Sequence, residues 1–205
     1  MLHPCARGWC PSLFVSDRLA MTKKDHNTVH WFPMRVTYGQ EMKIKERLDS
    51  LGVEHFLPMC YKTIETADKV ERRLLPAISN LIFISSSRQV ITELKMFDFA
   101  CSPLRYIIRE SGFDGMREIM TVSDDAMENF MRVAKMQDDS VFFLTPGDYV
   151  VNNVGKKVRI INGPFAGVVG VIKRVRRNKH VVVQIDDIAV AAIEFVPNQY
   201  LVELE

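Results

Sequence analysis

The chain has 205 residues, of which 47% are hydrophobic and 25% are charged, and its formal net charge is +2. This composition is that of a folded globular protein with room for one or two domains, and it excludes a disordered tail protein. The apolar runs are far shorter than the roughly 20 residues of a membrane-spanning helix, which excludes that class as well.

The N-terminal segment does not have the composition of a secretory signal peptide. Pro4, Pro11 and Asp17 interrupt its apolar residues, whereas a signal peptide has a basic start and then a continuous apolar stretch. An ordered pattern begins only near Val29. We therefore expect residues 1–28 to form a disordered extension, and Met21 is an alternative start to Met1.

The cysteines of the chain are isolated from one another and from histidine. None belongs to a CxxC pair or has a histidine at metal-ligand spacing. They are Cys5, Cys10, Cys60 and Cys101. We expect free thiols in a reducing cytoplasm, with no metal site and no cofactor.

The first two thirds of the chain predict helices packed on an antiparallel sheet, which is an α+β fold. We expect strands at 29–36, 53–66, 70–75, 81–84 and 104–108, and helices at 41–51, 89–97 and 124 to about 136. Gly52 is a natural stop for the first helix. The second helix has an apolar stripe that ends at Phe97. Ser123 is expected to cap the third helix, whose first turn is acidic.

Pro33 lies inside the first predicted strand. Because proline lacks the backbone N–H that a ladder needs, it indicates an edge, a bulge or a shifted register at this point.

The last third of the chain changes to short apolar runs separated by glycine, asparagine and proline, which is typical of a small β-barrel. About five strands are expected, at 157–161, 168–176, 181–185, 189–195 and 200–204. A polar break precedes them. We therefore predict an extension at 1–28, a first domain at 29–136, a linker at 137–145 and a second domain at 146–205.

The stretch INGPFAG at residues 161–167 is a glycine-rich corner. It could cradle a phosphate, or it could be only a tight turn. We favour the turn, because a phosphate loop usually leads into a helix N-terminus and this stretch leads into a β run.

Positive charge is concentrated after this corner. Residues 155–180 carry eight Lys or Arg and no acid, whereas residues 181–205 carry five acids and no Lys or Arg. The hairpin tip supplies four candidate phosphate contacts, Arg174, Arg176, Arg177 and Lys179, which would make nucleic-acid binding salt-dependent. A solvated loop explains the same charges equally well.

Two sets of residues, taken in chain order, resemble a known family. Gly155–Ile160, Gly163–Gly167 and Gly170–Ile172 resemble a KOW module. Trp31-Phe32, Gly39-Gln40-Glu41, Phe56-Leu57-Pro58 and Asn80–Ile84 resemble the N-terminal domain of the NusG family. The resemblance is nearest to the specialised paralogues such as RfaH and the antiterminators of gut-bacterial surface polysaccharide operons.

This resemblance implies a non-catalytic, cytoplasmic and monomeric transcription elongation and antitermination factor with an SH3-like KOW barrel. The first domain would bind the clamp of bacterial RNA polymerase. The barrel would bind a ribosomal protein, a termination factor or nascent RNA. An enzyme is not expected, because no nucleophile, base and orienting group can be named together. The alternative is a KOW-containing RNA-binding or ribosome-associated protein.

The resemblance also implies site residues. Ile78, Leu81 and Phe83 would contact the polymerase clamp through an exposed apolar patch beside Leu81; Phe83 could equally be a core residue. The expected contacts to non-template DNA are Thr37, Tyr38, Gln40, Lys43 and Thr92, for which a solvated polar surface is the other interpretation. Phe165 would bind a partner or pack beneath the glycine corner.

Overall fold

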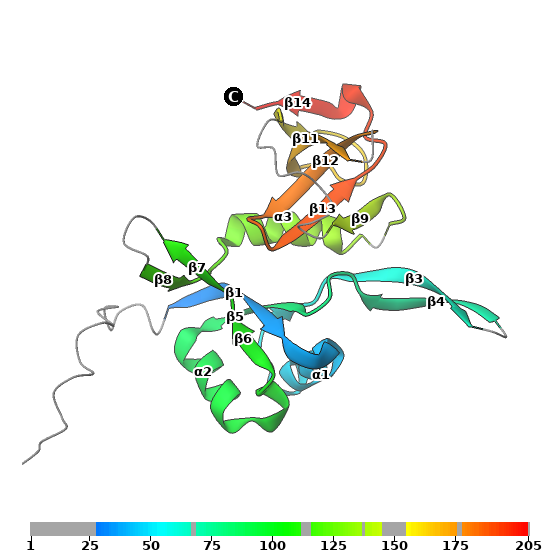
Figure 1. The fold of residues 1–205 in the computed structure, drawn as a ribbon. Coiled ribbons are helices and arrows are strands. Elements are labelled where there is room, and N and C mark those ends of the chain that lie inside the picture. Colours follow the sequence, from blue (N-terminus) through cyan, green and yellow to red (C-terminus); the bar gives the residue numbers. More distant parts are fainter. Residues whose placement is uncertain are drawn as a thin grey trace, which may run out of the picture.

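The fold described below is that of a computed structural model, which describes residues 28–66, 69–111, 116–136, 138–144, 155–175 and 178–204. Within these residues the strands form a four-stranded sheet, a six-stranded sheet and two separate hairpins. We call the four-stranded sheet with its flanking helices the first domain, and the six-stranded sheet the β domain (Figure 1). The predicted α+β fold class is confirmed.

The sheet of the first domain has the order β2-β5-β1-β6, and its named pairs are antiparallel. Its strands are β1 (Val29–Val36), β2 (His55–Phe56), β5 (Leu81–Ser87) and β6 (Leu104–Tyr106). Because side chains alternate along a strand, β5 presents Ile82 and Ile84 to one core and Leu81 and Phe83 to another. Both faces of this sheet are therefore covered.

Helices α1 (Glu41–Leu51) and α2 (Arg88–Phe97) cover one face. Ile44 and Leu48 of α1 are fully buried there. The helix ends at Gly52, whose left-handed φ of 65° lets its N–H bond back to the last turn. The side chain of Ser87 caps α2 by accepting from the N–H of Val90. Local signals thus set the ends of both helices.

Helix α3 (Asp124–Ala134) covers the opposite face. The Ser123 side chain accepts from the N–H of Ala126, as the cap prediction requires. One stripe of α3 is buried, namely Met127, Phe130, Val133 and Ala134. The ring of Phe130 lies 5.9 Å from that of Phe83 and 6.4 Å from that of Phe56, so α3 packs directly on the sheet.

Two hairpins extend from this sheet. Strands β3 (Met59–Thr66) and β4 (Lys69–Pro76) form an arm that projects well beyond the rest of the domain (Figure 1). Strands β7 (Ile108–Ser111) and β8 (Met116–Ile119) form the other. The predicted strand at 53–66 is divided into β2 and β3 around Pro58, and the β7–β8 hairpin was not predicted.

Pro33 causes neither a bulge nor a register shift, because β1 pairs with β5 continuously from Val29 to Arg35. Strand β1 is also not an edge strand. The carbonyl of Trp31 accepts from Val122 on the side away from β5, so the nitrogen of Pro33 faces that side too. Pairing with β6 begins only at Met34. The proline therefore occupies a position where β1 has no ladder donor to lose.

The β domain is an antiparallel sheet with the order β14-β10-β11-β12-β13-β9. Its strands are β9 (Val141–Leu144), β10 (Lys157–Ile160), β11 (Val169–Val175), β12 (Asn178–Ile185), β13 (Ala189–Ile193) and β14 (Leu201–Glu203). A short 3-10 turn, η3 (Asn198–Tyr200), precedes β14. Five of the strands lie where the sequence predicts them.

Strand β9 corrects the linker prediction. Residues 141–144 lie within the predicted linker of 137–145, yet they pair with β13 from Val190↔Leu144 to Ile193↔Val141. Val141 and Leu144 are buried. This apolar segment is an edge strand of the β domain because the open side of β13 supplies its hydrogen bonds.

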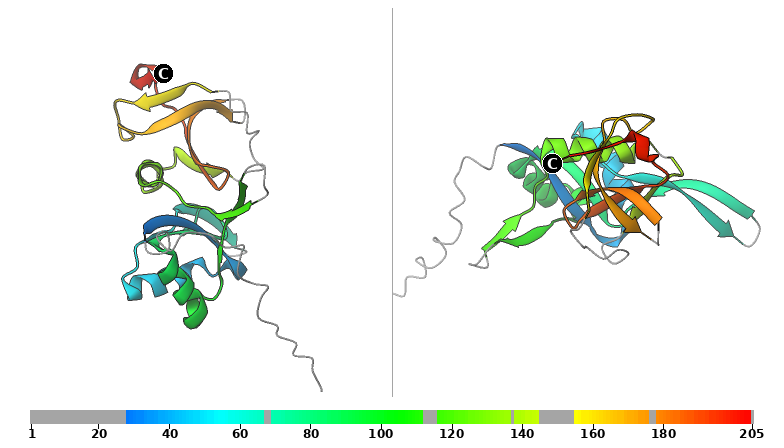
Figure 2. Two further views of the ribbon diagram at one scale, coloured as in Figure 1. Left: turned by 90° about the vertical axis from the view of Figure 1, so that its left-hand side faces the viewer. Right: turned by 90° about the horizontal axis from the view of Figure 1, so that it is seen from above.

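The two domains are not separate bodies. Helix α3 packs against β1 and also against β12 and β13, and one hydrophobic core runs from Trp31 and Phe83 through α3 into the β domain. Figures 1 and 2 show α3 lying between the two sheets. The β domain therefore covers the side of α3 that faces away from the first sheet.

Candidate interaction surfaces

The residues predicted to contact polymerase lie on the sheet face that carries α3. Leu81 and Phe83 are on β5, and Ile78 is in the loop before it. Leu81 is only 4% exposed, and Ile78 and Phe83 are buried too. The expectation of an exposed apolar patch beside Leu81 is therefore wrong for this arrangement, because α3 and the β domain cover the face.

The three residues are covered by different elements. Phe83 packs against Phe130 of α3 and is a core residue. Ile78 and Leu81 line a pocket of about 390 Å³ that Asp187 and Ile188, from the turn between β12 and β13, also line. Only Ile78 and Leu81 thus share a pocket with the β domain.

Polar contacts fix the β domain in this position. The Asn129 side chain on α3 donates to the carbonyl of Val169 at 2.7 Å and accepts from the Val169 N–H at 2.9 Å. Arg109 on β7 forms an ion pair with Asp186 at 2.7 Å. The Asn129 side chain bonds to both the N–H and the carbonyl of Val169, as a neighbouring strand would at the end of β11. This pair of bonds requires one orientation of α3 relative to β11.

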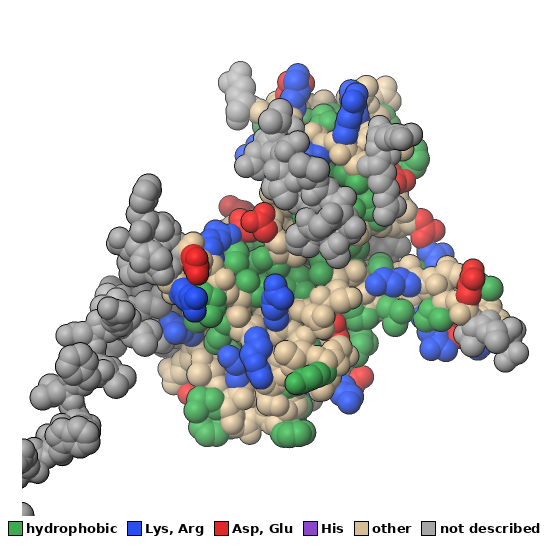
Figure 3. Space-filling model, in the orientation of Figure 1, with side chains coloured by type: hydrophobic (Ala, Val, Ile, Leu, Met, Phe, Trp, Pro, Cys, Tyr) green, Lys and Arg blue, Asp and Glu red, His purple; other side chains and the backbone are tan. Residues whose placement is uncertain are grey.

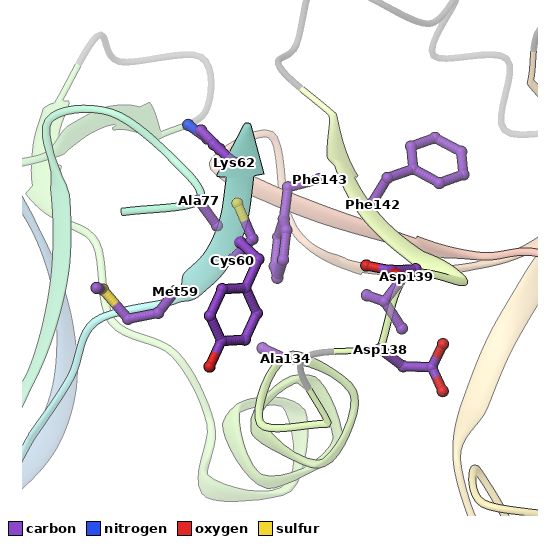
Figure 4. A pocket seen from close by; sticks show the side chains of 11 residues that line it. Met59, Cys60, Lys62, Ala77, Ala134, Asp138, Asp139, Phe142 and Phe143 are labelled. Atoms are coloured by element: carbon purple, nitrogen blue, oxygen red, sulfur yellow. The ribbon is translucent and has the colours of Figure 1, made fainter. Parts of the chain in front are cut away.

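A second pocket, also of about 390 Å³, lies where the base of the β3–β4 arm meets the end of α3 and strand β9 (Figure 4). Cys60, Lys62, Asp139 and Phe143 are among the side chains around it. Arg72 of the arm forms an ion pair with Asp139. Burial raises the pKa of the Cys60 thiol, so this cysteine is not activated as a nucleophile.

The predicted DNA contacts fall into two groups. Thr37, Tyr38, Gln40 and Lys43 lie together at the junction of β1, the 3-10 turn η1 (Thr37–Gly39) and α1. Tyr38 is 89% exposed and has a left-handed φ of 65°. Thr92 lies elsewhere: its hydroxyl donates to the carbonyl of Arg88 and lies 3.1 Å from the hydroxyl of Tyr106.

The basic hairpin presents part of its charge to solvent. Arg174 and Lys179 are exposed and are directly opposite each other on β11 and β12. Two like charges in this position repel, and a bound phosphate would relieve that repulsion. Arg176 and Arg177 lie outside the described residues.

Other polar residues of the hairpin turn inward. Lys173 is buried and donates to Gln184 at 3.0 Å. His180 is buried against the ring of Phe142, with Glu194 at 3.5 Å. Neither side chain is available to a phosphate.

The glycine corner is a structural turn. Gly163 and Gly167 have φ of 84° and 88°, which glycine adopts without strain. The N–H groups of Ala166, Gly167 and Val168 donate to Gly163, Ile160 and Phe165 carbonyls. Because these donors are used within the turn, the phosphate-cradle interpretation is not supported. Phe165 is buried beneath the corner, where it packs in the core.

The described residues contain no group of three or more His, Cys, Asp or Glu that could hold a metal ion. Cys60 and Cys101 are free thiols, and Cys5 and Cys10 lie outside the part of the chain that the structure describes. No helix among the described residues is long and apolar enough to cross a membrane.

These features define a protein built from an α+β domain, an apolar face beneath a small β domain, and surfaces suited to binding. Residues 29–131, just over half of the chain, match the family described as NusG, transcription termination factor nusG. The chain belongs to the NusG family, whose members are non-catalytic transcription factors, and its role is in transcription.

A solved structure of NusG from Thermotoga maritima, described as "Domain interaction in Thermotoga maritima NusG", is similar to this chain with 16% sequence identity and a TM-score of 0.40. The similarity covers 87% of this chain and 98% of that chain. No curated protein matches the chain.

Proposed function

We propose that this chain is an elongation and antitermination factor that binds the RNA polymerase clamp through Ile78 and Leu81 and a second partner through the β domain. The family supports a role in transcription. The observation that carries the specific proposal is an apolar pair that a separate part of the chain covers. Phe83 supports this pair from the core.

Binding through Ile78 and Leu81 requires the β domain to move away. The turn with Asp187 and Ile188 shares their pocket, and the Asn129–Val169 and Arg109–Asp186 contacts hold the β domain in place. A polymerase surface therefore competes with the chain's own β domain. The free energy of binding polymerase is therefore less favourable than it would be if Ile78 and Leu81 were already exposed. The difference is the free energy needed to separate the β domain from the first domain.

The test is recovery of RNA polymerase by tagged full-length protein. Ile188→Asp replaces a half-buried apolar side chain beside Ile78 and Leu81 with a hydrated carboxylate and disfavours docking, since the apolar contact between the two domains is lost. We expect this variant to recover more polymerase than the wild type does. Val202→Asp is the matched control, because Val202 is exposed on β14.

A second change locates the polymerase contact. Ile78→Glu, made in the Ile188→Asp background, should abolish the recovery that Ile188→Asp gained. Circular dichroism should show that both variants retain their fold. If neither wild type nor Ile188→Asp recovers polymerase even at low salt, the proposed function is refuted.

The alternative function, an RNA-binding or ribosome-associated protein, is favoured by one observation, the facing cations Arg174 and Lys179. For single-stranded RNA each phosphate contact contributes about 0.7 to the slope of log K against log salt concentration. Arg174→Gln with Lys179→Gln should reduce that slope by about 1.4 if both touch phosphates. An unchanged slope would remove the hairpin from RNA binding.

We also propose, from the sequence resemblance, that the protein serves a few surface polysaccharide operons and acts as a cytoplasmic monomer. Nascent RNA, a ribosomal protein or a termination factor would then be the partner of the β domain. Sequencing of transcripts bound to polymerase, with and without the protein, tests the operon assignment. Light scattering tests the monomer.

A further inference from the structure

Docking of the β domain leaves open the pocket that its β12–β13 turn shares with Leu81. The volume of about 390 Å³ is ordinary for a small-molecule site, and such sites are frequent at domain interfaces. The apolar wall comes from both domains and consists of Ile78, Leu81, Ile107, Ile108, Met120 and Ile188. On the face drawn in Figure 3, apolar side chains gather where the two domains meet, with charged side chains beside them.

One cation at this pocket has no acidic partner. Arg35, on β1, also lines the pocket and is exposed. It is directly opposite Leu81 of β5, and such cross-strand partners project from the same face of a sheet, so the Arg35 side chain begins beside the apolar wall. Among the described residues, no carboxylate lies within ion-pair distance of Arg35. Its guanidinium is therefore able to receive an anion.

The other charged groups near the pocket are engaged or screened. Arg109 pairs with Asp186. Arg105, directly opposite Arg35 on β6, donates to two backbone carbonyls of its own segment. Asp187 is exposed, so water and salt screen its charge. An anion at the pocket would thus be bound by Arg35, and it would also relieve the repulsion between Arg35 and Arg105.

Hydrogen bonds hold the backbone around the pocket. The N–H of Asn80 donates to the carboxylate of Glu41 on α1, and the carbonyl of Asn80 accepts from the N–H of Val36 at 3.0 Å. The N–H of Met120 donates to the carbonyl of Ile107 at 2.9 Å. Because these segments are already ordered, a ligand that enters the pocket loses less free energy in ordering the protein.

We propose that this pocket binds a small amphiphilic anion, with its acidic group at Arg35 and its apolar body between Leu81 and Ile188. A guanidinium binds carboxylates and phosphates through its paired N–H donors. An inorganic anion would leave the apolar wall in contact with water, so an apolar body adds to the binding free energy. A macromolecule could reach Leu81 only after the β domain had left.

Such a ligand regulates docking. Leu81 belongs to the first domain and Ile188 to the β domain. A molecule that contacts both binds the docked chain better than the separated chain, and its binding shifts the population toward the docked chain. One consequence rests on the proposed function: the ligand lowers the recovery of RNA polymerase.

The experiment titrates the full-length protein with anilinonaphthalene sulfonate, an amphiphilic anion that becomes fluorescent in apolar surroundings. Arg35→Gln should weaken its binding at least about tenfold, because a charge-assisted hydrogen bond is lost. Arg159→Gln is the matched control and should bind as the wild type does, since Arg159 is exposed on β10 and does not line this pocket. Both side chains are exposed, so thermal unfolding should be unchanged. Wild-type affinity in Arg35→Gln overturns the proposal.

Competitors test the chemistry of the ligand. Octanoate should displace the probe, whereas octanol and acetate should each do so at least about tenfold more weakly, because octanol lacks the charge and acetate lacks the apolar body. Equal displacement by either one contradicts an amphiphilic anion. Asp187→Asn removes a like charge and should bind the probe at least as tightly as the wild type does. Weaker binding would show that the pocket requires this carboxylate, which is incompatible with the proposal.

Hydrogen exchange at the amide of Val169 tests the link to docking. Its N–H donates to the Asn129 side chain of α3 in the docked chain. A probe that binds only the docked chain, added at about ten times its dissociation constant, should slow this exchange about elevenfold. Unchanged exchange would show that the probe does not favour docking and would overturn the proposal. None of these assays contains polymerase, so a failed polymerase recovery leaves their results unaffected.

Discussion

Replacing Asn129 with alanine removes the most specific polar link between α3 and the β domain. The side chain makes two hydrogen bonds to Val169, at 2.7 and 2.9 Å. A protein hydrogen bond contributes about 0.5–1.5 kcal/mol net, so the pair is worth about 1–3 kcal/mol. Losing the two bonds should weaken the docking of the β domain on α3, because both bonds join α3 to β11 and neither lies within a sheet. The fraction of molecules with the β domain detached should rise about 5- to 150-fold.

Hydrogen exchange at the Val169 amide, measured by NMR, reports the loss of this contact. Its N–H donates to the Asn129 side chain in the docked state, so Asn129→Ala should speed its exchange by at least the same factor, because the variant removes the acceptor as well as favouring opening. Gln89→Ala is the control, because Gln89 is exposed on α2 and its side-chain amide bonds to Glu93 along the same helix. Equal exchange of the Val169 amide in the wild type and Asn129→Ala would refute the argument that this side chain holds the domains together.

Three further changes test other parts of the structure. Leu81→Ala should lower the free energy of unfolding in urea by about 2–5 kcal/mol, because Leu81 is buried in the shared core; a loss under about 1 kcal/mol would contradict that burial. Gly170→Ala should cost about 1–3 kcal/mol, since the added Cβ would lie 2.6 Å from a methyl group of Val181, and a neutral effect would show that β11 and β12 can move apart. The hydrogen bond from Arg47 lowers the pKa of Asp98, so this carboxylate stabilises the fold above the ordinary aspartate range, and the contribution is lost as pH falls through the lowered pKa. Asp98→Asn should therefore destabilise the protein more at about pH 7 than at about pH 2, and an equal effect at both values would exclude the charge as the cause.

The elements that sequence predicted well are those set by neighbouring residues. Helix α1 has its observed bounds of Glu41–Leu51 because Ile44 and Leu48 form one stripe and Gly52 ends it. The N-cap of α3 is likewise local. Short-range spacing and capping were sufficient for these elements.

The elements that sequence missed depend on distant residues. Strand β9 forms because its backbone pairs with the edge of β13, which lies over forty residues later in the chain. The short apolar run at 141–144 has no local feature that predicts this pairing. The burial of Leu81 depends on α3 and the β domain. Neither relation is visible in local periodicity.

The exposure of Phe97 was missed for a related reason. Helical spacing placed Phe97 on an inward stripe with Ile91, and only Ile91 is fully buried. The helix ends at Phe97 and the backbone of Asp98 is extended. Phe97 therefore lies beyond the core on which the earlier residues of the stripe pack. A helix terminus can therefore display a side chain that periodicity assigns to the interior.

Strand β9 also determines where the chain can be divided. A fragment that starts at residue 146 would leave the β13 backbone from Val190 to Ile193 without its neighbour, and such an open edge invites pairing between identical copies. Fragments of this kind would form dimers or aggregates for a reason unrelated to their native behaviour. A truncation that preserves the six-stranded sheet has to begin at or before Asp138, whose carbonyl accepts from the N–H of Val141 and anchors the strand at its start.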